Sequence, residues 1–281
     1  MKMGSLRRAL FSLSAAAAAQ VAMAQGEVRH YVRYETEGSV AYGVIEGEEI
    51  AELAGAPFEA ERRTGRRVRR SGARLLAPCE PSKVIAVGLN YRSHLGDQAA
   101  AEYPGLFAKM PTSIIGPEDE IPYPPDAENL HYEGELVLVI GRRAKNVSVE
   151  EAPAHIFGVT CGNDLSERNW QRADLQWFRA KATDGFGPLG PAIARGLNYG
   201  DLLLETRVNG ETRQSQRTRD LIFDAPLIVS YVSRYVTLLP GDVIYTGTPG
   251  RTAAVAPGDV IEVEIEGIGI LRNRVVAAPG D

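Results

Sequence analysis

Apolar residues occur mainly in short runs whose periodicity predicts β-strands. Residues 28–53 alternate β-type runs with glycine turns, which is typical of a small meander. The continuous apolar run at 136–140 predicts a strand that is buried on both faces. At 260–266, Val263 and Ile265 alternate with acidic residues, as in a strand with one buried face. Strands therefore dominate the prediction.

A few turn and helix signals interrupt the strands. Asn209-Gly210 between two β-type runs indicates a tight hairpin. Asp224 is expected to cap a helix whose apolar residues follow the 3.6 period, and Ser148 with Glu151 forms a capping-box pattern. Regular strand–helix alternation and glycine-rich phosphate motifs are absent from the sequence. We therefore predict a β-rich α+β fold.

The first 24 residues have the pattern of a signal peptide. Lys2, Arg7 and Arg8 precede an alanine-rich apolar run that ends in Ala22-Met23-Ala24. We expect residues 1–24 to be removed and the mature protein to be periplasmic or secreted, by Sec or twin-arginine export. The alternative is an alanine-rich helix on a cytoplasmic protein.

An arginine-rich run at 61–70 follows the predicted meander. Without interleaved aromatic residues, such a run is more typical of a solvated linker or face than of an anion-binding patch. We place the domain boundary after it. A small N-terminal β domain and Arg-rich linker would span residues 25–75, and a catalytic, metal-binding domain residues 76–281.

The amino-acid composition indicates a globular protein and argues against several other classes. The 281 residues are 44% hydrophobic and 24% charged, as in an ordinary globular protein. A net charge of −5 argues against nucleic-acid binding by phosphate neutralisation, and no run after the signal is long enough to span a membrane. Cys79 and Cys161 cannot form a disulfide scaffold or a Cys-rich zinc site. One bridge is possible, but Cys161 lies in an apolar run and is expected to be a buried thiol.

Acidic residues lie beside two of the predicted strands. Glu133 and Glu135 precede residues 136–140 and, two positions apart, project to one face of a strand. Asp164 follows the apolar run at 156–161, which would deliver a third carboxylate to the same pocket. Three carboxylates without clustered His or Cys favour Mg²⁺ or Mn²⁺ with positions open to water or substrate. The alternative is an acidic strand end that faces bulk water.

His94 and Asp97 follow the apolar run at 84–87. If residues 92–101 are helical, the two side chains share a face, and the carboxylate can orient the imidazole as it takes a proton from water. The alternative is an ordinary exposed pair.

Four further side chains are candidates for binding a substrate oxyanion or carboxylate. They are Arg168, Gln171, Lys181 and Thr248. An exposed loop lysine is the alternative for Lys181.

In order and spacing, these segments resemble the fumarylacetoacetate hydrolase family over roughly residues 76–277. The resemblance rests on Gly88-Leu89-Asn90-Tyr91 with His94, His131-Tyr132-Glu133-Gly134-Glu135-Leu136, Asn163-Asp164 with Arg168 and Gln171, Lys181 with Gly187-Pro188-Leu189-Gly190-Pro191, and Thr246-Gly247-Thr248-Pro249.

This resemblance implies a mixed β-sandwich or roll catalytic domain after a small N-terminal β domain, usually as a homodimer. It implies that Mg²⁺ or Mn²⁺ is bound by Glu133, Glu135 and Asp164, and that Lys181, Gln171 and Thr248 contact substrate. It also implies that His94 with an acidic partner activates water or handles protons on a mobile lid. The partner is often Glu in the family, and Asp97 is one methylene shorter. Arg251 follows a glycine that many members continue with valine, so it either favours a second anionic group on the substrate or faces water.

The family hydrolyses, decarboxylates, hydrates or isomerises 2-oxo acids. Our leading hypothesis is metal-dependent cleavage of a C–C bond in a 2,4-dioxo acid of acylpyruvate type, through a stabilised enolate. Oxaloacetate decarboxylation, or hydration or isomerisation of an unsaturated 2-oxo acid, is the alternative at the same site. A non-catalytic, exported dicarboxylate-binding protein is a second alternative.

Overall fold

The computed structural model describes residues 27–278. The predicted signal peptide at 1–24 lies outside the described residues and stays a prediction. None of the helices within 27–278 is both long and apolar enough to cross a membrane.

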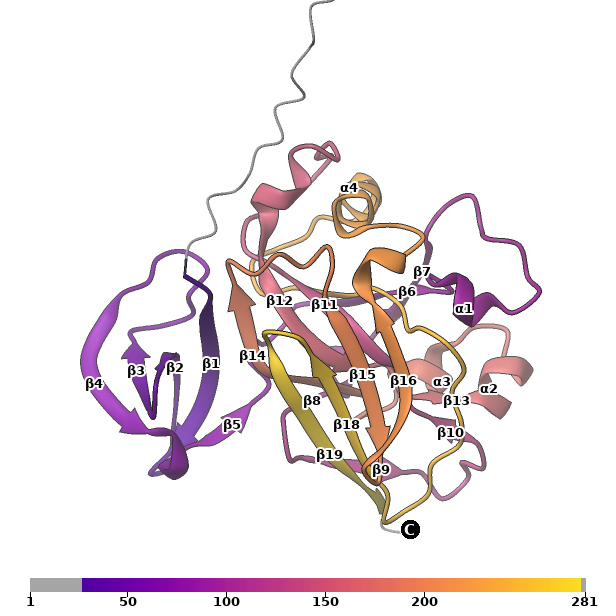
Figure 1. The fold of residues 1–281 in the computed structure, drawn as a ribbon, viewed down its shortest axis with the longest axis horizontal. Helices are drawn as coiled ribbons and strands as arrows, with labels where there is room; N and C mark the ends of the chain where they lie inside the picture. The colour runs from indigo at the N-terminus through magenta and orange to yellow at the C-terminus, as the bar shows by residue number, and fades with distance from the viewer. Residues whose placement is uncertain (1–26, 279–281) are drawn as a thin grey trace, which may run out of the picture.

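A twelve-stranded sheet runs through the molecule (Figure 1). Its main path, in spatial order, is β4 (Arg63–Arg69), β3 (Glu49–Leu53), β2 (Ser39–Glu46), β1 (Arg29–Thr36), β14 (Gly187–Arg195), β12 (Ile156–Asn163), β11 (Gly134–Ile140), β17 (Val243–Tyr245), β6 (Val84–Gly88) and β7 (Gly105–Lys109). Off this path, β5 (Arg74–Leu76) pairs with β1, and β8 (Ile114–Ile115) pairs with β14.

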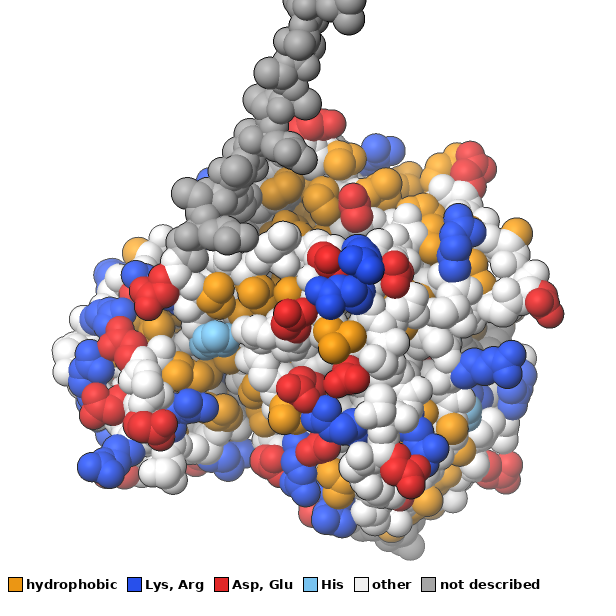
Figure 2. Space-filling view, viewed as in Figure 1, with side chains coloured by type: hydrophobic (Ala, Val, Ile, Leu, Met, Phe, Trp, Pro, Cys, Tyr) orange, Lys and Arg blue, Asp and Glu red, His pale blue; other side chains and the backbone are white. Residues whose placement is uncertain are grey.

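The meander predicted at 28–53 is confirmed by the antiparallel strands β1, β2 and β3. The arginine-rich run is largely a strand, β4, so its interpretation as a linker is wrong, although its side chains are exposed as expected. The strand pairs antiparallel with β3, and Arg63 and Arg67 form ion pairs with Glu46 at the end of β2. Figure 2 shows acidic and basic side chains interspersed over this N-terminal lobe.

A second, five-stranded sheet packs against the first. In spatial order it contains β16 (Glu211–Arg217), β15 (Leu203–Val208), β18 (Val260–Ile265), β19 (Gly269–Ala277) and β9 (Glu120–Tyr123). The turn between β15 and β16 is Asn209-Gly210, with both residues at positive φ, as the hairpin signal predicts. The alternation in β18 is confirmed, because Val263 and Ile265 are buried in the core that also contains Leu136 of β11.

Strand β11 lies in the centre of the molecule, and all seven of its residues are buried. Leu136 and Leu138 face the core between the two sheets, whereas Val137 and Val139 face a second core on the other side. The prediction of a strand buried on both faces is therefore confirmed.

The helices are short and lie at the margins of the sheets (Figure 1). They are α1 (Arg92–Leu95), α2 (Arg168–Ala173), α3 (Phe178–Ala182) and α4 (Ala225–Tyr235), with 3₁₀ turns η1 (Arg70–Gly72), η2 (Pro111–Ser113), η3 (Ala152–His155) and η4 (Thr218–Asp220). A small ribbon pairs β10 (Leu130–His131) with β13 (Ser166–Glu167). Asp224 caps α4 as predicted, because its Oδ1 accepts the Leu227 N–H at 3.0 Å.

Two local predictions need correction. The helix expected at 92–101 ends at Leu95, where Gly96 adopts a φ of 61° that cannot continue a helix. Ser148 and Glu151 form their reciprocal capping hydrogen bonds, but the segment that follows is only the turn η3.

Cys79 and Cys161 are both free and buried. The disulfide is therefore not formed, in agreement with the expected buried thiol at Cys161. Burial raises the pKa of Cys79 to about 12, so this thiol is unreactive at neutral pH.

Candidate metal centre and active site

Three buried carboxylates converge at the ends of β11 and β12. The antiparallel register places Gly134 opposite Asn163, so Glu133 and Asp164 are neighbours across the two strands. Glu135 projects to the same side as Glu133, and one oxygen from each of the three lies within 4.8 Å of the others. The expected convergence is therefore observed.

Backbone contacts hold these strand ends together. The Asp164 N–H donates to the Glu133 carbonyl at 2.8 Å, and the Asn163 side chain accepts the Glu133 N–H at 2.9 Å. The Gly247 N–H donates to Glu135 Oε2 at 2.7 Å. Gly247 has a φ of +105°, and a Cβ there would lie 2.7 Å from that of Asn90, so only glycine brings this N–H to the carboxylate.

The donor set fits a hard divalent cation. Burial, followed by the charges of Asp164 and Glu133, raises the pKa of the Glu135 carboxyl well above its ordinary value. Within residues 27–278 no basic side chain lies within ion-pair distance of Glu135, so the charge of Lys181 favours the ionised carboxylate only from farther away. A bound cation would relieve this repulsion, and Glu133, Glu135 and Asp164 would hold it.

Two buried lysines balance part of the negative charge. Lys181 Nζ lies 2.6 Å from Glu133 Oε2 and 2.7 Å from Asp164 Oδ2, and these carboxylates outweigh burial and raise the pKa of Lys181. Lys109 Nζ lies 2.6 Å from Asp164 Oδ1 and also donates to the Lys181 carbonyl, but burial lowers its pKa. The exposed-loop interpretation of Lys181 is therefore wrong.

Arg168 closes the other side of Glu133. Its guanidinium contacts Glu133 Oε1, donates to Gln171 Oε1 at 2.7 Å and donates to Thr252 Oγ1 at 2.9 Å. Although burial favours the neutral acid, Lys181 and Arg168 hold the pKa of Glu133 well below its usual range. Glu133 is therefore ionised at neutral pH.

His94 faces this cluster, but Asp97 does not orient it. His94 Nδ1 donates to the Gly250 carbonyl at 2.6 Å, because a carbonyl can only accept. In the neutral ring Nε2 is then the basic nitrogen, and it lies 3.7 Å from Glu133 Oε1. Asp97 is exposed beyond the end of α1, and no hydrogen bond or ion pair joins it to His94 among the described residues. The geometry expected for a His94–Asp97 dyad is therefore wrong.

One cavity of about 540 Å³ opens onto these groups. Nine of the ten side chains singled out from the sequence line it: His94, Glu133, Glu135, Asp164, Arg168, Gln171, Lys181, Thr248 and Arg251. Asp97 is the tenth and lies outside. The remaining wall includes the apolar side chains of Val87, Phe107 and Trp177, and Arg172 adds a further cation.

The structure adds two buried polar residues that the sequence interpretation missed. Lys109 ends an otherwise mostly exposed strand, and Gln214 is the only buried residue of β16. Their burial depends on contacts with residues 34 to 80 positions away, so no local pattern distinguishes them.

Both the N-terminal and the C-terminal part of the chain match known protein-family models. Residues 83–276 match the fumarylacetoacetate (FAA) hydrolase C-terminal model, which covers more than half of the sequence. The chain belongs to the fumarylacetoacetate hydrolase family. Residues 29–78 match the Rv2993c-like N-terminal model. The predicted family and its mixed, β-rich architecture are therefore confirmed.

Similar proteins include enzymes that are named for different reactions. Oxaloacetate tautomerase FAHD2A of Homo sapiens mitochondria is 39% identical over 222 residues, which are 74% of this chain and 71% of that protein. The structure of 5-carboxymethyl-2-hydroxymuconate delta-isomerase from Mycobacterium smegmatis is 45% identical, with a TM-score of 0.85 over 88% of this chain and 99% of that one. Maleylpyruvate hydrolase from Sphingobium sp. SYK-6, in complex with manganese(II) and pyruvate, is 28% identical, with a TM-score of 0.74 over 89% and 100%.

These findings support an enzyme that processes 2-oxo acids with a divalent cation. The acidic triad described above supplies the ligands that such a cation requires.

Proposed function

We propose that the protein catalyses proton transfer beside the ketone of a 2-oxo acid, an enol–keto tautomerisation or isomerisation. The observation that carries this proposal is the orientation of His94, whose Nδ1–H is fixed by the Gly250 carbonyl and whose Nε2 faces the acidic cluster. One base held in one tautomer is what such a transfer requires. The human relative named a tautomerase and the Mycobacterium smegmatis structure named an isomerase support it.

In this proposal Glu133, Glu135 and Asp164 hold Mg²⁺ or Mn²⁺. Such a cation stabilises negative charge on the oxygens of a 2-oxo carboxylate. The manganese(II) ion in the Sphingobium hydrolase supports this choice.

Other residues of the site would transfer the proton, stabilise the developing charge and bind the substrate. His94 Nε2 takes the proton from the carbon next to the ketone and returns it to oxygen, or the reverse. Lys181, buried beside Glu133 and Asp164, places a positive charge where the enolate oxygen develops. Arg168, Gln171 and Thr248 line the cavity and would contact the substrate, and Arg251 in the same wall would meet a second anionic group.

Hydrolysis of a 2,4-dioxo acid is the second candidate, supported by the Sphingobium neighbour named a hydrolase. There His94 Nε2 would deprotonate water, with the Gly250 carbonyl in the place expected for Asp97. Decarboxylation of oxaloacetate needs an enolate but no base, so it would not depend on His94.

Replacing His94 with alanine separates these reactions. We expect His94→Ala to lower the kcat of enol–keto conversion of oxaloacetate by at least about 100-fold, since a positioned base contributes 10²–10⁴-fold. Cation binding, measured by calorimetry, should persist. Unchanged tautomerisation in the variant contradicts the proposal, whereas selective loss of acylpyruvate cleavage favours the hydrolase.

We also propose export and a homodimer. An N-terminus near Gln25 in the purified native protein is expected, and a start at Met1 contradicts export. Light scattering should give twice the mass of the mature chain, and a monomer mass contradicts the dimer.

A further inference from the structure

We propose that Gln214 is a positioning residue that joins the metal-ligand segment to the loop that orients His94. Gln214 lies on β16, where its side chain is buried while its neighbours Arg213 and Ser215 are exposed. It points inward from an otherwise exposed hairpin strand toward the candidate site. The inference deepens the proposed function and rests on it for its activity measurements.

The hydrogen bonds of Gln214 admit one orientation of its amide. Gln214 Oε1 accepts the Gly134 N–H at 3.1 Å, which only donates. Gln214 Nε2 donates to the Pro249 carbonyl at 2.6 Å, which only accepts, and to Thr248 Oγ1 at 2.8 Å. Thr248 then donates to the Gly134 carbonyl at 2.9 Å and closes a ring. Gly134 lies between the candidate ligands Glu133 and Glu135, so one amide connects their segment to the 248–249 loop.

The same loop continues directly to His94. Gly250 follows Pro249, and its carbonyl accepts the Nδ1–H of His94. A second connection comes from β16, because Gln216 accepts from Ser93 Oγ at 2.5 Å and Ser93 accepts the Gly250 N–H at 2.9 Å. The N–H of Gly250 is therefore held from β16 through Ser93, while its carbonyl holds His94.

Close packing makes this connection stiff. A Cβ on Gly134 would lie 2.0 Å from Thr206 Oγ1, so β15 presses against the ligand segment as only glycine allows. Removing the Gln214 amide would leave the buried Gly134 N–H and Pro249 carbonyl without partners. The 248–250 loop would then shift to satisfy them, and the tautomer of His94 would no longer be fixed.

Gln214→Met tests the inference because it keeps the length of the side chain and removes its hydrogen bonds. We expect kcat for tautomerisation to fall about 10- to 100-fold, the usual effect of losing a residue that orients a site from behind, with little change in KM. Ser215→Ala, an exposed neighbour on β16, is the matched control and should retain native rates.

Two readouts separate positioning from general damage. In ¹⁵N NMR of histidine-labelled protein, with the His94 signals assigned from His94→Ala, native His94 should be protonated at Nδ1, and Gln214→Met should give a mixture of tautomers. In the His94→Ala background, Gln214→Met should cause no further loss of kcat, because residues that act through one another are not additive.

A native His94 tautomer together with native kcat in Gln214→Met overturns the inference. If Gln214→Met does not fold, Gln214→Glu at pH 8 keeps the acceptor for Gly134 and removes the donor to Pro249, and the same NMR result decides. If His94→Ala itself is fully active, the proposed function is wrong. The NMR measurement of the His94 tautomer still tests the positioning role of Gln214.

Discussion

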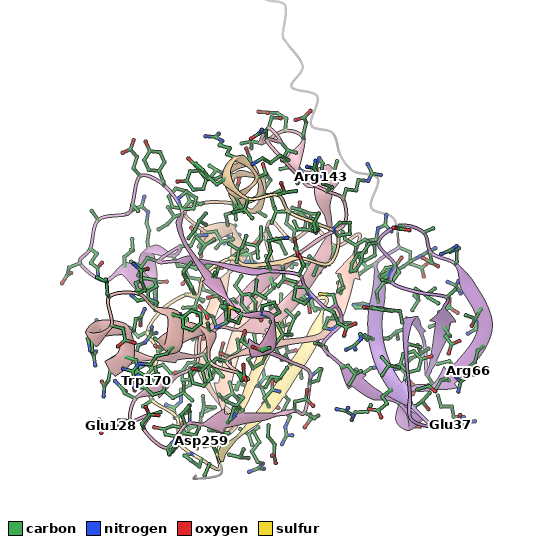
Figure 3. The ribbon with its side chains drawn as sticks, turned by 180° about the vertical axis from the view of Figure 1, so that it is seen from behind. Glu37, Arg66, Glu128, Arg143, Trp170 and Asp259 are labelled. Carbon is green, nitrogen blue, oxygen red and sulfur yellow. The ribbon has the colours of Figure 1, made fainter. Side chains whose placement is uncertain are left out.

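Ion pairs occur in two contrasting regions of this molecule. On the N-terminal lobe, Arg66 pairs with Glu37 at 3.1 Å, and their side chains are 44% and 83% exposed (Figure 3). In the site, Lys109 pairs with Asp164 at 2.6 Å, and their side chains are 0% and 2% exposed. The distances are similar, but the surroundings differ completely.

The difference decides what each pair contributes. Exposed pairs are screened by water and salt and typically stabilise by about 0–1 kcal/mol. A buried charge has lost its hydration, so removing its partner leaves it uncompensated at a cost of about 3–5 kcal/mol. Charges on the lobe are therefore replaceable, whereas charges in the site depend on one another.

The largest expected effect comes from Glu135→Gln, which removes a candidate metal ligand that forms no ion pair with a basic side chain among the described residues. We expect turnover to fall at least about 1,000-fold, because cation binding contributes several kcal/mol to such reactions. Calorimetric titration with Mg²⁺ or Mn²⁺ should show no binding. Glu262→Gln on β18, outside the cavity, is the control, and normal rates of Glu135→Gln in metal-depleted buffer contradict the assignment.

Lys109→Met should cause the second largest change, this time in stability. It leaves Asp164 with one buried cation, Lys181, instead of two. The free energy of unfolding of the metal-free protein should fall by about 3 kcal/mol, as measured by denaturant unfolding. A variant as stable as the native protein would show that the buried pair contributes no more than a surface pair.

Arg251→Ala tests a charge that belongs to neither class, since Arg251 is exposed to solvent like the lobe charges but lines the cavity like the site charges. We expect KM for a substrate with two carboxylates to rise about 10-fold while kcat stays constant, from loss of one charge-assisted contact. A monocarboxylate acylpyruvate should be unaffected. Arg143→Ala, which is exposed and does not line the cavity, is the control. Equal effects on both substrates would mean that Arg251 only faces water.

Arg66→Ala should have the smallest effect. Arg66 pairs with the exposed Glu37 and with Glu52, whose mostly buried carboxylate still accepts hydrogen bonds from Tyr34 and Thr64. The melting temperature should therefore change by no more than about 2 °C. Differential scanning calorimetry measures this shift, and raising the salt concentration should reduce it further. A drop as large as that of Lys109→Met would remove the distinction between the two regions.

Strand periodicity predicted the parts of the site that depend on local geometry. Glu133 and Glu135 share a face because side chains alternate along a strand, and Asp164 meets them because β11 and β12 are paired. The prediction of a helix at 92–101 was wrong because the pattern of apolar and polar residues does not show that Gly96 adopts a positive φ. Gln214 was not predictable, because a lone glutamine in an exposed-looking strand is buried only by contacts with distant segments.

The pairing of β1 with β14 has a consequence for how the chain can be divided. His30 lies opposite Ala194 and Tyr31 opposite Ile193, so one ladder of backbone hydrogen bonds crosses the boundary between the two family matches. A truncated protein that began at β6 would leave residues 193–195 of β14 unpaired on that side, a template for intermolecular strand addition. The N-terminal lobe thus covers a stretch of sheet edge that the larger part of the chain would otherwise expose.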